Sequence, residues 1–377
     1  MKADLLVVGG GPAGASLAYL ASKAGFRVVV VERKHTPENP TICGEYLPDW
    51  DVLKSTLSSY RGMLPFVRDR FYSRELILNR TQTITVEFSG ERTTLEFKGA
   101  VIDRAKAVSS LLEEAESSGA KVMLSTWYHG SKVCRDKVIS KIGSSTLESD
   151  YLAAADGYSS LAAKSAGLSS QLPPEDVALV TLQRAKCNHS ESDVYMEFSE
   201  IAPGGYAFII PRGGLCNIGV GYPKSHRKKI TIAHREFLKK VEAAPTHSRV
   251  YAKLLPVGGL VKKPAASRVL LVGDAVGAVM PTNGGGIPLA ALTAHLAAEA
   301  LKSESPEEKY TRLLKPLSQT LKAGLAARKI GEKVVFNRTL ARASLKLAPK
   351  SAVLAVLSMD TRTRALKLMR VVSTLFL

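Results

Sequence analysis

The chain opens with an apolar run that a glycine-rich turn separates from a helix of small residues. Leu5 to Val8 is continuous Leu and Val, Gly9 to Gly14 forms the turn, and a further run of valines ends at Val31. Continuous apolar strands are typical of a parallel sheet that helices cover on both faces. The sequence therefore predicts a β-α-β unit, with its second strand over 27–31.

A different pattern, the alternation of β-forming and polar residues, occupies 71–97. It is clearest from Thr83 to Phe88, and β-patterned segments recur from Val177 to Tyr222. Such alternation is typical of antiparallel strands with one solvated face. We therefore expect an antiparallel layer inserted into the first domain.

The segments outside this layer again predict the alternating strands and helices of the first domain, and the end of the chain predicts helices alone. We expect a helix over 104–117, a strand over 121–125, a hairpin around 132–142, a strand ending at Asp156, and a buried strand over 269–272, with helices beyond Leu289. The expected fold class is α/β: a Rossmann-like dinucleotide-binding domain, an inserted antiparallel β-sheet domain and a helical C-terminal region. The expected bounds are 1–65, 99–170 and 260–300 for the first domain, 66–98 and 171–259 for the second, and 301–377 for the helical region.

Composition and charge limit the class of protein to which the chain can belong. With 377 residues, 45% hydrophobic and 23% charged, the chain is neither disordered, collagen-like nor a disulfide miniprotein. The net charge is +18, and 309–377 holds fifteen Lys or Arg against two acids. Basic amphipathic helices bind anionic membrane surfaces or form solvated faces on a protein body, and both interpretations stay open here. Nucleic acid is a weaker candidate because no nucleic-acid-binding motif accompanies the charge.

The cysteine spacing and the lengths of the apolar runs indicate in which cellular compartment we expect the protein. Cys43, Cys134, Cys187 and Cys216 have no CxxC or Cys/His ligand spacing, so the sequence suggests neither a zinc site nor a disulfide framework. No apolar run reaches the ~18 residues of a membrane-spanning helix. A cytoplasmic location follows as the expectation, with peripheral contact at the inner face of the membrane as an open extension.

Two glycine-rich segments carry the candidate chemistry. Gly9, Gly11 and Gly14 make GxGxxG between a strand and a helix, and Glu32 ends the next strand, where it can accept hydrogen bonds from a ribose. This fingerprint suits FAD and NAD alike. The second segment begins with Gly273-Asp274 after a buried strand and reaches Gly286 before a helix, which suits the ribitol and pyrimidine edge of a flavin.

Four further short motifs of this chain also occur in known flavoproteins. Arg104 opens the helix after the first antiparallel segment, Asp156-Gly157 follows a strand, Cys43-Gly44-Glu45 lies in the loop after the second strand, and Tyr206 to Pro211 has an aromatic-x-aromatic-x-x-Pro form. Together with the glycine-rich segments, this order resembles the geranylgeranyl reductase branch of the FAD-dependent oxidoreductases that include aromatic hydroxylases. The resemblance covers roughly residues 1–300 and implies a hydroxylase-like fold.

The resemblance also implies roles for individual residues. FAD would be the cofactor, Cys43 would face the flavin ring as the catalytic candidate, and an isoprenoid chain would be the substrate. The implied cofactor-binding residues are Gly9, Gly11, Pro12, Ala13, Gly14, Glu32, Arg33, Cys43, Gly44, Arg104, Asp156, Gly157, Gly273, Asp274, Gly284, Gly285, Gly286 and Ile287; the substrate-binding residues are Tyr206, Phe208, Ile210 and Pro211. The branch usually has Trp where this chain has Phe208, which changes the pocket shape.

The implied reaction is hydrogenation of geranylgeranyl-type double bonds, plausible for a membrane lipid precursor. Reduced flavin would deliver hydride from its N5, and because no histidine lies in a recognised motif, water is a candidate proton donor. The electron donor stays open between NAD(P)H, ferredoxin and a deazaflavin. Two alternatives remain: an FAD-dependent monooxygenase of an apolar or aromatic substrate, and a basic membrane- or nucleic-acid-binding protein with structural FAD.

Overall fold

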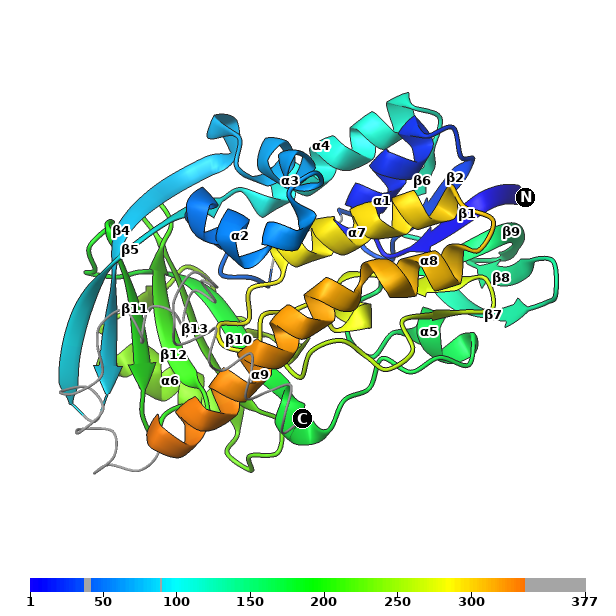
Figure 1. Ribbon diagram of the computed structural model, residues 1–377. Helices are drawn as coiled ribbons and strands as arrows, with labels where there is room; N and C mark the ends of the chain where they lie inside the picture. The colour runs from blue at the N-terminus through cyan, green and yellow to red at the C-terminus, as the bar shows by residue number, and fades with distance from the viewer. Residues whose placement is uncertain (37–41, 89, 336–377) are drawn as a thin grey trace.

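The computed structural model describes residues 1–36, 42–88 and 90–335 of the chain. Two β-sheets lie at opposite ends of the molecule, and helices pack across its middle (Figure 1). The sheet at the N-terminal end is mainly parallel, and the other is mainly antiparallel, as the two hydrophobic patterns predict.

The first sheet is the core of the dinucleotide-binding architecture. Its strand order is β16-β17-β9-β1-β2-β6, with the β7–β8 hairpin paired to β9. The strands are β1 (Lys2–Val8), β2 (Val28–Val31), β6 (Lys121–Met123), β7 (Tyr128–Val133), β8 (Val138–Ile142), β9 (Ser145–Ala154), β16 (Ala265–Ala266) and β17 (Val269–Leu271). All four residues of β2 are buried valines, because helices and neighbouring strands enclose both faces.

The second sheet has the order β14-β10-β13-β12-β11-β4-β5-β3, with β15 paired to β10. The strands are β3 (Tyr46–Pro48), β4 (Ile77–Phe88), β5 (Glu91–Ile102), β10 (Val177–Lys186), β11 (Asp193–Phe198), β12 (Tyr206–Pro211), β13 (Cys216–Pro223), β14 (Ala244–Pro245) and β15 (Tyr251–Pro256). One pair, β11 with β4, is parallel. It joins the two segments of the chain that build this sheet, which no hairpin connects.

The helices pack on both sheets. They are α1 (Pro12–Lys23), α2 (Trp50–Thr56), α3 (Leu64–Phe71), α4 (Arg104–Ser117), α5 (Leu161–Ser165), α6 (Ile230–Lys240), α7 (Ile287–Leu301), α8 (Pro306–Leu313) and α9 (Lys315–Val335). Helix α1 contacts β1, β2, α4 and α7, whereas α6 covers β10 and β13. Helix α6 buries positions i, i+3, i+4, i+7 and i+8 from Ile230, the spacing of one helical face.

The first half of the basic C-terminal region is part of this core. Tyr310 is fully buried and its hydroxyl donates to the Leu271 carbonyl at 2.7 Å, while Leu317 and Leu321 have no exposed surface. Helix α9 continues diagonally towards the second sheet (Figure 1). The remaining residues of the expected basic region, 336–377, lie outside the described residues.

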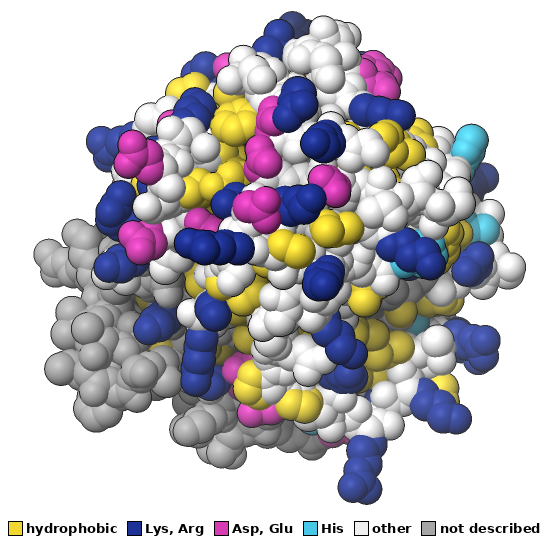
Figure 2. Space-filling view, turned by 90° about the vertical axis from the view of Figure 1, so that its right-hand side faces the viewer, with side chains coloured by type: hydrophobic (Ala, Val, Ile, Leu, Met, Phe, Trp, Pro, Cys, Tyr) yellow, Lys and Arg dark blue, Asp and Glu magenta, His cyan; other side chains and the backbone are white. Residues whose placement is uncertain are grey.

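Charged side chains of both signs are spread over one face of the molecule. At the end of the molecule that carries the first sheet, Lys and Arg side chains are scattered over the face, with Asp and Glu side chains between them (Figure 2). Among the described residues no helix is long and apolar enough to span a membrane.

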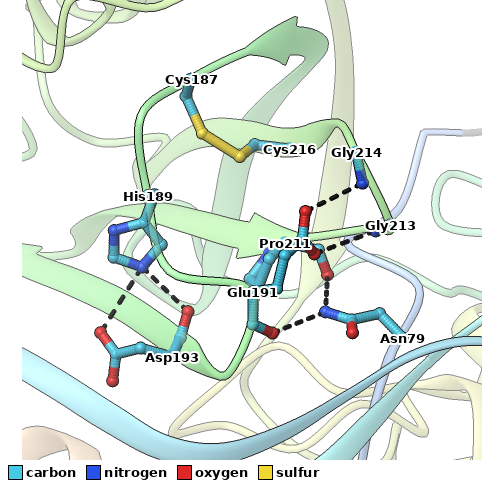
Figure 3. The surroundings of a disulfide bond; sticks show 9 residues. All are labelled: Asn79, Cys187, His189, Glu191, Asp193, Pro211, Gly213, Gly214 and Cys216. Carbon is cyan, nitrogen blue, oxygen red and sulfur yellow. Dashed lines mark hydrogen bonds and ion pairs between the residues drawn. A yellow bond between two sulfur atoms is a disulfide. The ribbon is translucent and has the colours of Figure 1, made fainter.

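The structure contains one disulfide that the cysteine spacing did not suggest. Cys187 and Cys216 form a disulfide that joins the end of β10 to the start of β13 (Figure 3). Sequence spacing could not reveal it, because the two residues meet only through the register in which Ala185 lies opposite Cys216. Cys43 and Cys134 are free.

A buried histidine links α6 to the second sheet. His234 has no exposed surface, and its ring nitrogens lie 2.9 Å from Thr181 Oγ1 and 3.1 Å from Gln183 Oε1. A neutral ring can donate its Nε2–H to the Gln183 oxygen and direct its Nδ1 to the Thr181 hydroxyl, which also lies 3.2 Å from the Val220 carbonyl. Burial lowers the pKa of His234 from 6.5 to about 4.

This shift predicts acid-dependent loss of stability. The neutral ring stabilises the fold above the unfolded pKa of 6.5, and the contribution disappears as the pH falls through that value towards about 4. One pKa unit corresponds to ~1.36 kcal/mol, so the loss is about 3 kcal/mol. Urea unfolding across this range should show the stability difference between the wild type and His234→Gln shrinking at acid pH. A constant difference would contradict the assignment.

Candidate active site

Residues of both sheets line one cavity of about 1390 Å³. Its walls include the glycine-rich turn after β1, the loop before α7, the Cys43 loop and the apolar face of the second sheet. Helix α9 contributes Ala327, Arg328 and Ile330. The sequence motifs, which lie far apart along the chain, thus surround a common space.

The turn between β1 and α1 is a tightly packed backbone cradle. Gly9 has a φ of +102°, and a Cβ there would lie 2.5 Å from the Ala155 carbonyl oxygen. A Cβ on Gly14 would lie 1.8 Å from the Gly9 oxygen, so both positions require glycine. Gly11, by contrast, has a φ of −75° and lines the cavity at the N-terminus of α1. That helix end, with its free N–H groups, suits a pyrophosphate.

Glu32 lies beside this cradle and is buried. Its Oε2 accepts a hydrogen bond from the Gly10 backbone N–H at 2.7 Å, and its Oε1 accepts from the Lys34 N–H at 2.8 Å. Glu32 also lines the cavity. Each carboxylate oxygen has two lone pairs, so the ribose contact expected from the sequence is compatible with these bonds.

The loop before α7 forms the opposite part of the cradle. Gly284, Gly285, Gly286 and Ile287 line the cavity together with Asp274. Asp274 Oδ2 pairs with Lys253 Nζ of β15 at 2.6 Å. The backbone N–H groups at the start of α7 suit the acceptor atoms of a flavin's pyrimidine edge.

Arg104, Asp156 and Gly157 also line the cavity. Asp156 has a structural role besides: its carboxylate accepts from the Ser160 hydroxyl and from the Ala162 backbone N–H, which anchors the start of α5. Burial raises the pKa of Asp156 above its usual range.

The loop that carries Cys43 is fixed to the second sheet. Gly44 and Cys43 line the cavity, and the Glu45 backbone N–H donates to Cys43 Sγ at 3.3 Å. Glu45 has a φ of +59° and is 1% exposed. Its Oε2 lies 2.7 Å from Arg212 Nε, so a buried ion pair holds this turn against the sheet.

The second sheet gives the cavity an apolar wall. It consists of Ile84, Val86, Phe88, Phe97, Val180, Leu182, Val194, Met196, Phe198, Phe208 and Ile210. Phe208 lies opposite Gly219, where a Cβ would come within 2.2 Å of the ring, so the glycine leaves room for the aromatic side chain. Tyr206 lines the same wall, and its hydroxyl donates to the Asn283 carbonyl at 2.7 Å. Burial raises the pKa of Tyr206 well above its usual value.

Three of the predicted site residues do not line the cavity. They are Gly14, Gly273 and Pro211. Gly273 serves packing instead, since a Cβ there would lie 2.7 Å from the Ala13 Cβ, and the Pro211 carbonyl accepts from Asn79. Lys253, which pairs with Asp274, was not predicted, because no local motif marks it.

The cavity fits FAD on the features of this chain. The glycine cradle and the helix start suit the pyrophosphate, Asp274 suits the ribitol, and the start of α7 suits the ring. FAD supplies reversible transfer of two electrons when bound. The part of the cavity that the second sheet lines is chiefly apolar, as in sites that bind apolar ligands.

Comparisons with known proteins agree with this geometry. The family model described as "FAD binding domain" matches residues 79–320, and the model described as "NAD(P)-binding Rossmann-like domain" matches residues 7–37. The chain is 30% identical over 318 residues to a digeranylgeranylglycerophospholipid reductase of Methanothrix thermoacetophila, covering 80% of this chain and 78% of the relative.

Two further similarities extend over most of the chain. It is 28% identical over 357 residues to a digeranylgeranylglycerophospholipid reductase of Methanocaldococcus jannaschii, covering 88% of this chain and 87% of that one. A crystal structure of a geranylgeranyl bacteriochlorophyll reductase-like protein from Thermoplasma acidophilum superposes with a TM-score of 0.80 at 23% identity, covering 98% and 96% of the two chains. The latter similarity concerns the fold.

The cradle predicts the effect of a side chain at Gly11. Because its φ is accessible to any residue, Gly11→Val should fold but lose most of its flavin, since the side chain would occupy the pyrophosphate's approach. The measurement is flavin absorbance per protein after purification. Gly62→Val is the matched control, because nothing lies within 4 Å of a Cβ at Gly62. Full flavin occupancy in Gly11→Val would contradict the site.

Proposed function

The chain belongs to the geranylgeranyl reductase family of FAD-dependent oxidoreductases, and we propose that it hydrogenates the double bonds of a prenyl lipid, a precursor of membrane lipid. Relatives of this family are named digeranylgeranylglycerophospholipid reductases, which favours a substrate with geranylgeranyl chains.

One observation supports this proposal most directly: the apolar wall of the second sheet and the flavin cradle share a cavity. A long hydrocarbon binds by leaving water, at ~0.8 kcal/mol for each buried CH₂. Met196, Phe208 and Ile210 offer such a surface, and Gly44 places the Cys43 loop beside it, where a Cβ would lie 2.7 Å from Ile210 Cδ1. A prenyl chain on this wall would lie next to the flavin ring.

The protein's part in the reaction is positioning and the exclusion of water. The wall orients the alkene, Tyr206 fastens the wall to the loop before α7, and Cys43 occupies the cavity side of the opposite loop. The reduced cofactor supplies the hydride equivalent when bound. The aliphatic and aromatic groups keep water from the remaining double bonds.

Delivery of the substrate from a membrane is the second part of the proposal. Helix α9 lines the cavity, and an ion pair between Arg328 and Asp176, both side chains 11% exposed, fastens it to the start of β10. Residues 336–377 follow α9 and hold eight Lys or Arg against one acid, Asp360. We propose that this segment binds an anionic membrane surface.

The apolar wall predicts the effect of a charge at Phe208. Phe208→Asp should raise the lipid KM by at least about tenfold while sparing FAD, because the carboxylate must be desolvated against the chain. The assay is anaerobic turnover of a geranylgeranyl lipid by the dithionite-reduced protein. Phe208→Leu is the matched control, since it stays apolar and should keep most of the activity.

Two results would contradict this prediction. Unchanged lipid turnover in flavin-replete Phe208→Asp would remove the wall from the substrate site. Oxygen-dependent hydroxylation of a small aromatic compound, without lipid reduction, would replace the reductase by a monooxygenase. Absence of any flavin reduction or turnover would instead favour a structural role for FAD.

The basic segment predicts salt-sensitive membrane binding. The full chain should prefer anionic over neutral vesicles and dissociate as salt rises, since attraction is screened over ~10 Å at 0.1 M salt. A chain truncated after Val335 should lose the preference but keep its flavin, because it retains the core residues of α8 and α9. Vesicle co-sedimentation is the measurement. Equal binding to both vesicles, or to neither, would refute the electrostatic contact.

A further inference from the structure

A buried polar cluster anchors the Cys43 loop to the second sheet. Glu45 Oε2 accepts from Arg212 Nε at 2.7 Å and from Arg184 Nη2 at 3.4 Å. Asn217 Nδ2 lies 3.5 Å from the same oxygen and donates to the Gly44 carbonyl at 3.0 Å. Arg184 and Asn217 face each other in the β10–β13 register, so the sheet itself places these groups together.

The turn after β12 and the disulfide between β10 and β13 hold the backbone around this cluster in place. Glu191 accepts from the Gly213 and Gly214 backbone N–H groups at 3.2 and 2.8 Å, which holds the turn next to Arg212 (Figure 3). The disulfide joins β10 to β13 at Cys216, the residue before Asn217. The cluster is therefore built on constrained backbone.

Two oxygens of the cluster have no hydrogen-bond donor among the described residues: Glu45 Oε1 and Asn217 Oδ1. Both side chains are buried, at 1% and 0% exposed. A buried polar group without a hydrogen bond destabilises the fold, so such oxygens normally bind a donor. A water molecule has two hydrogens to donate, and buried waters typically satisfy groups of this kind.

The cluster also extends from the cavity towards solvent. Glu45 lines the cavity at one end, whereas the Arg184 side chain at the other end is 35% exposed. The neighbouring cavity wall is apolar, with Phe208 and Ile210 close by. The cluster is thus a polar interruption of an otherwise apolar wall, and one of its members is in contact with solvent.

Alkene reduction needs a source of protons. Each double bond takes up a hydride and a proton, and the proton ends on carbon inside an apolar cavity. No histidine occurs among the described residues that line the cavity. Proton delivery to carbon by a positioned group contributes about 10²–10⁴-fold to a rate. We therefore expect the protein to hold a proton donor near the alkene.

We propose that Glu45 and Asn217 hold the water that protonates the alkene; this rests on the proposed reductase function. One alkene carbon would take the hydride, with its two electrons, that reduced FAD supplies when bound, and the π bond breaks. The adjacent carbon would take the proton of the O–H bond that otherwise points to Asn217 Oδ1, and the electrons of that bond stay on oxygen. The second O–H bond keeps its hydrogen bond to Glu45 Oε1. The positive charges of Arg184 and Arg212, which both bind Glu45 Oε2, would offset the charge of the resulting hydroxide until a proton from solvent restores the water. Glu45 is thus a positioning residue.

The test compares Glu45→Gln with Glu197→Gln. Gln at position 45 can still accept from Arg212, but its NH₂ group replaces the oxygen that would accept from the water. Glu197 is the matched control: it is also 1% exposed, pairs with Lys240 at 2.7 Å and has its Oε1 without a partner among the described residues. Its neighbours Met196 and Phe198 line the cavity, so Glu197 points to the other face of the sheet.

The measurement is anaerobic reoxidation of dithionite-reduced protein, mixed either with micelles of a geranylgeranyl diether phospholipid or with ferricyanide. Glu45→Gln should be reoxidised by the lipid at least about tenfold more slowly than the wild type, with a changed pH profile, and Glu197→Gln within about twofold. Ferricyanide takes electrons without protonating carbon, so it should reoxidise all three proteins alike. Flavin content is measured first.

The outcomes separate this inference from the proposed function. If the lipid fails to reoxidise the wild type, the proposed function itself fails. If the wild type reacts and Glu45→Gln matches it, or loses its ferricyanide reaction equally, the water site is overturned while the function stands. Should Glu45→Gln lose its flavin, Asn217→Leu removes the second oxygen and should show the same selective slowing; an unchanged rate would overturn the inference.

Discussion

The site depends on two polar contacts that join the second sheet to the loop before α7. The Tyr206 hydroxyl donates to the Asn283 carbonyl at 2.7 Å, and Lys253 pairs with Asp274 at 2.6 Å. Neither sheet alone forms a site for hydrocarbon reduction: the first provides a polar cradle for the cofactor and the second an apolar wall. Because these contacts are partly buried and directional, they fix the wall relative to the cradle. FAD and a prenyl chain can then share one cavity.

Much of the fold could be predicted from the sequence because its signals are local. Valines buried on both faces mark β2, and the crowding of Gly9 and Gly14 against neighbouring backbone explains a spacing that only glycine satisfies. The disulfide and the Glu45 cluster had no local signal. Both depend on the register of β10 against β13, which sets Arg184 opposite Asn217 and brings Cys187 to Cys216. Lys253 is similarly identified only by its pairing across the cavity.

The basic C-terminal region shows how composition can group residues with different roles. By charge alone 309–377 is one segment, yet Tyr310 and Leu317 belong to the central core and Arg328 is committed to Asp176. A long apolar or aromatic side chain packed on the first sheet contributes more to stability than exposed charge does, so α8 and α9 follow the core. Arg312, Lys315, Lys322 and Lys329 of α8 and α9 are exposed. They remain candidates for a membrane contact together with the charges after Val335, which follow the helix that lines the cavity.

The central claim is that electrons from bound FAD pass directly to double bonds of a prenyl lipid in this cavity. A single-turnover experiment tests it: protein with a known amount of reduced flavin is mixed with excess geranylgeranyl diether phospholipid without oxygen, and flavin absorbance and lipid mass are measured on the same sample. The account predicts that every flavin oxidised corresponds to one double bond saturated. Flavin that stays reduced beside unchanged lipid, or that reoxidises only after oxygen is admitted, would contradict it.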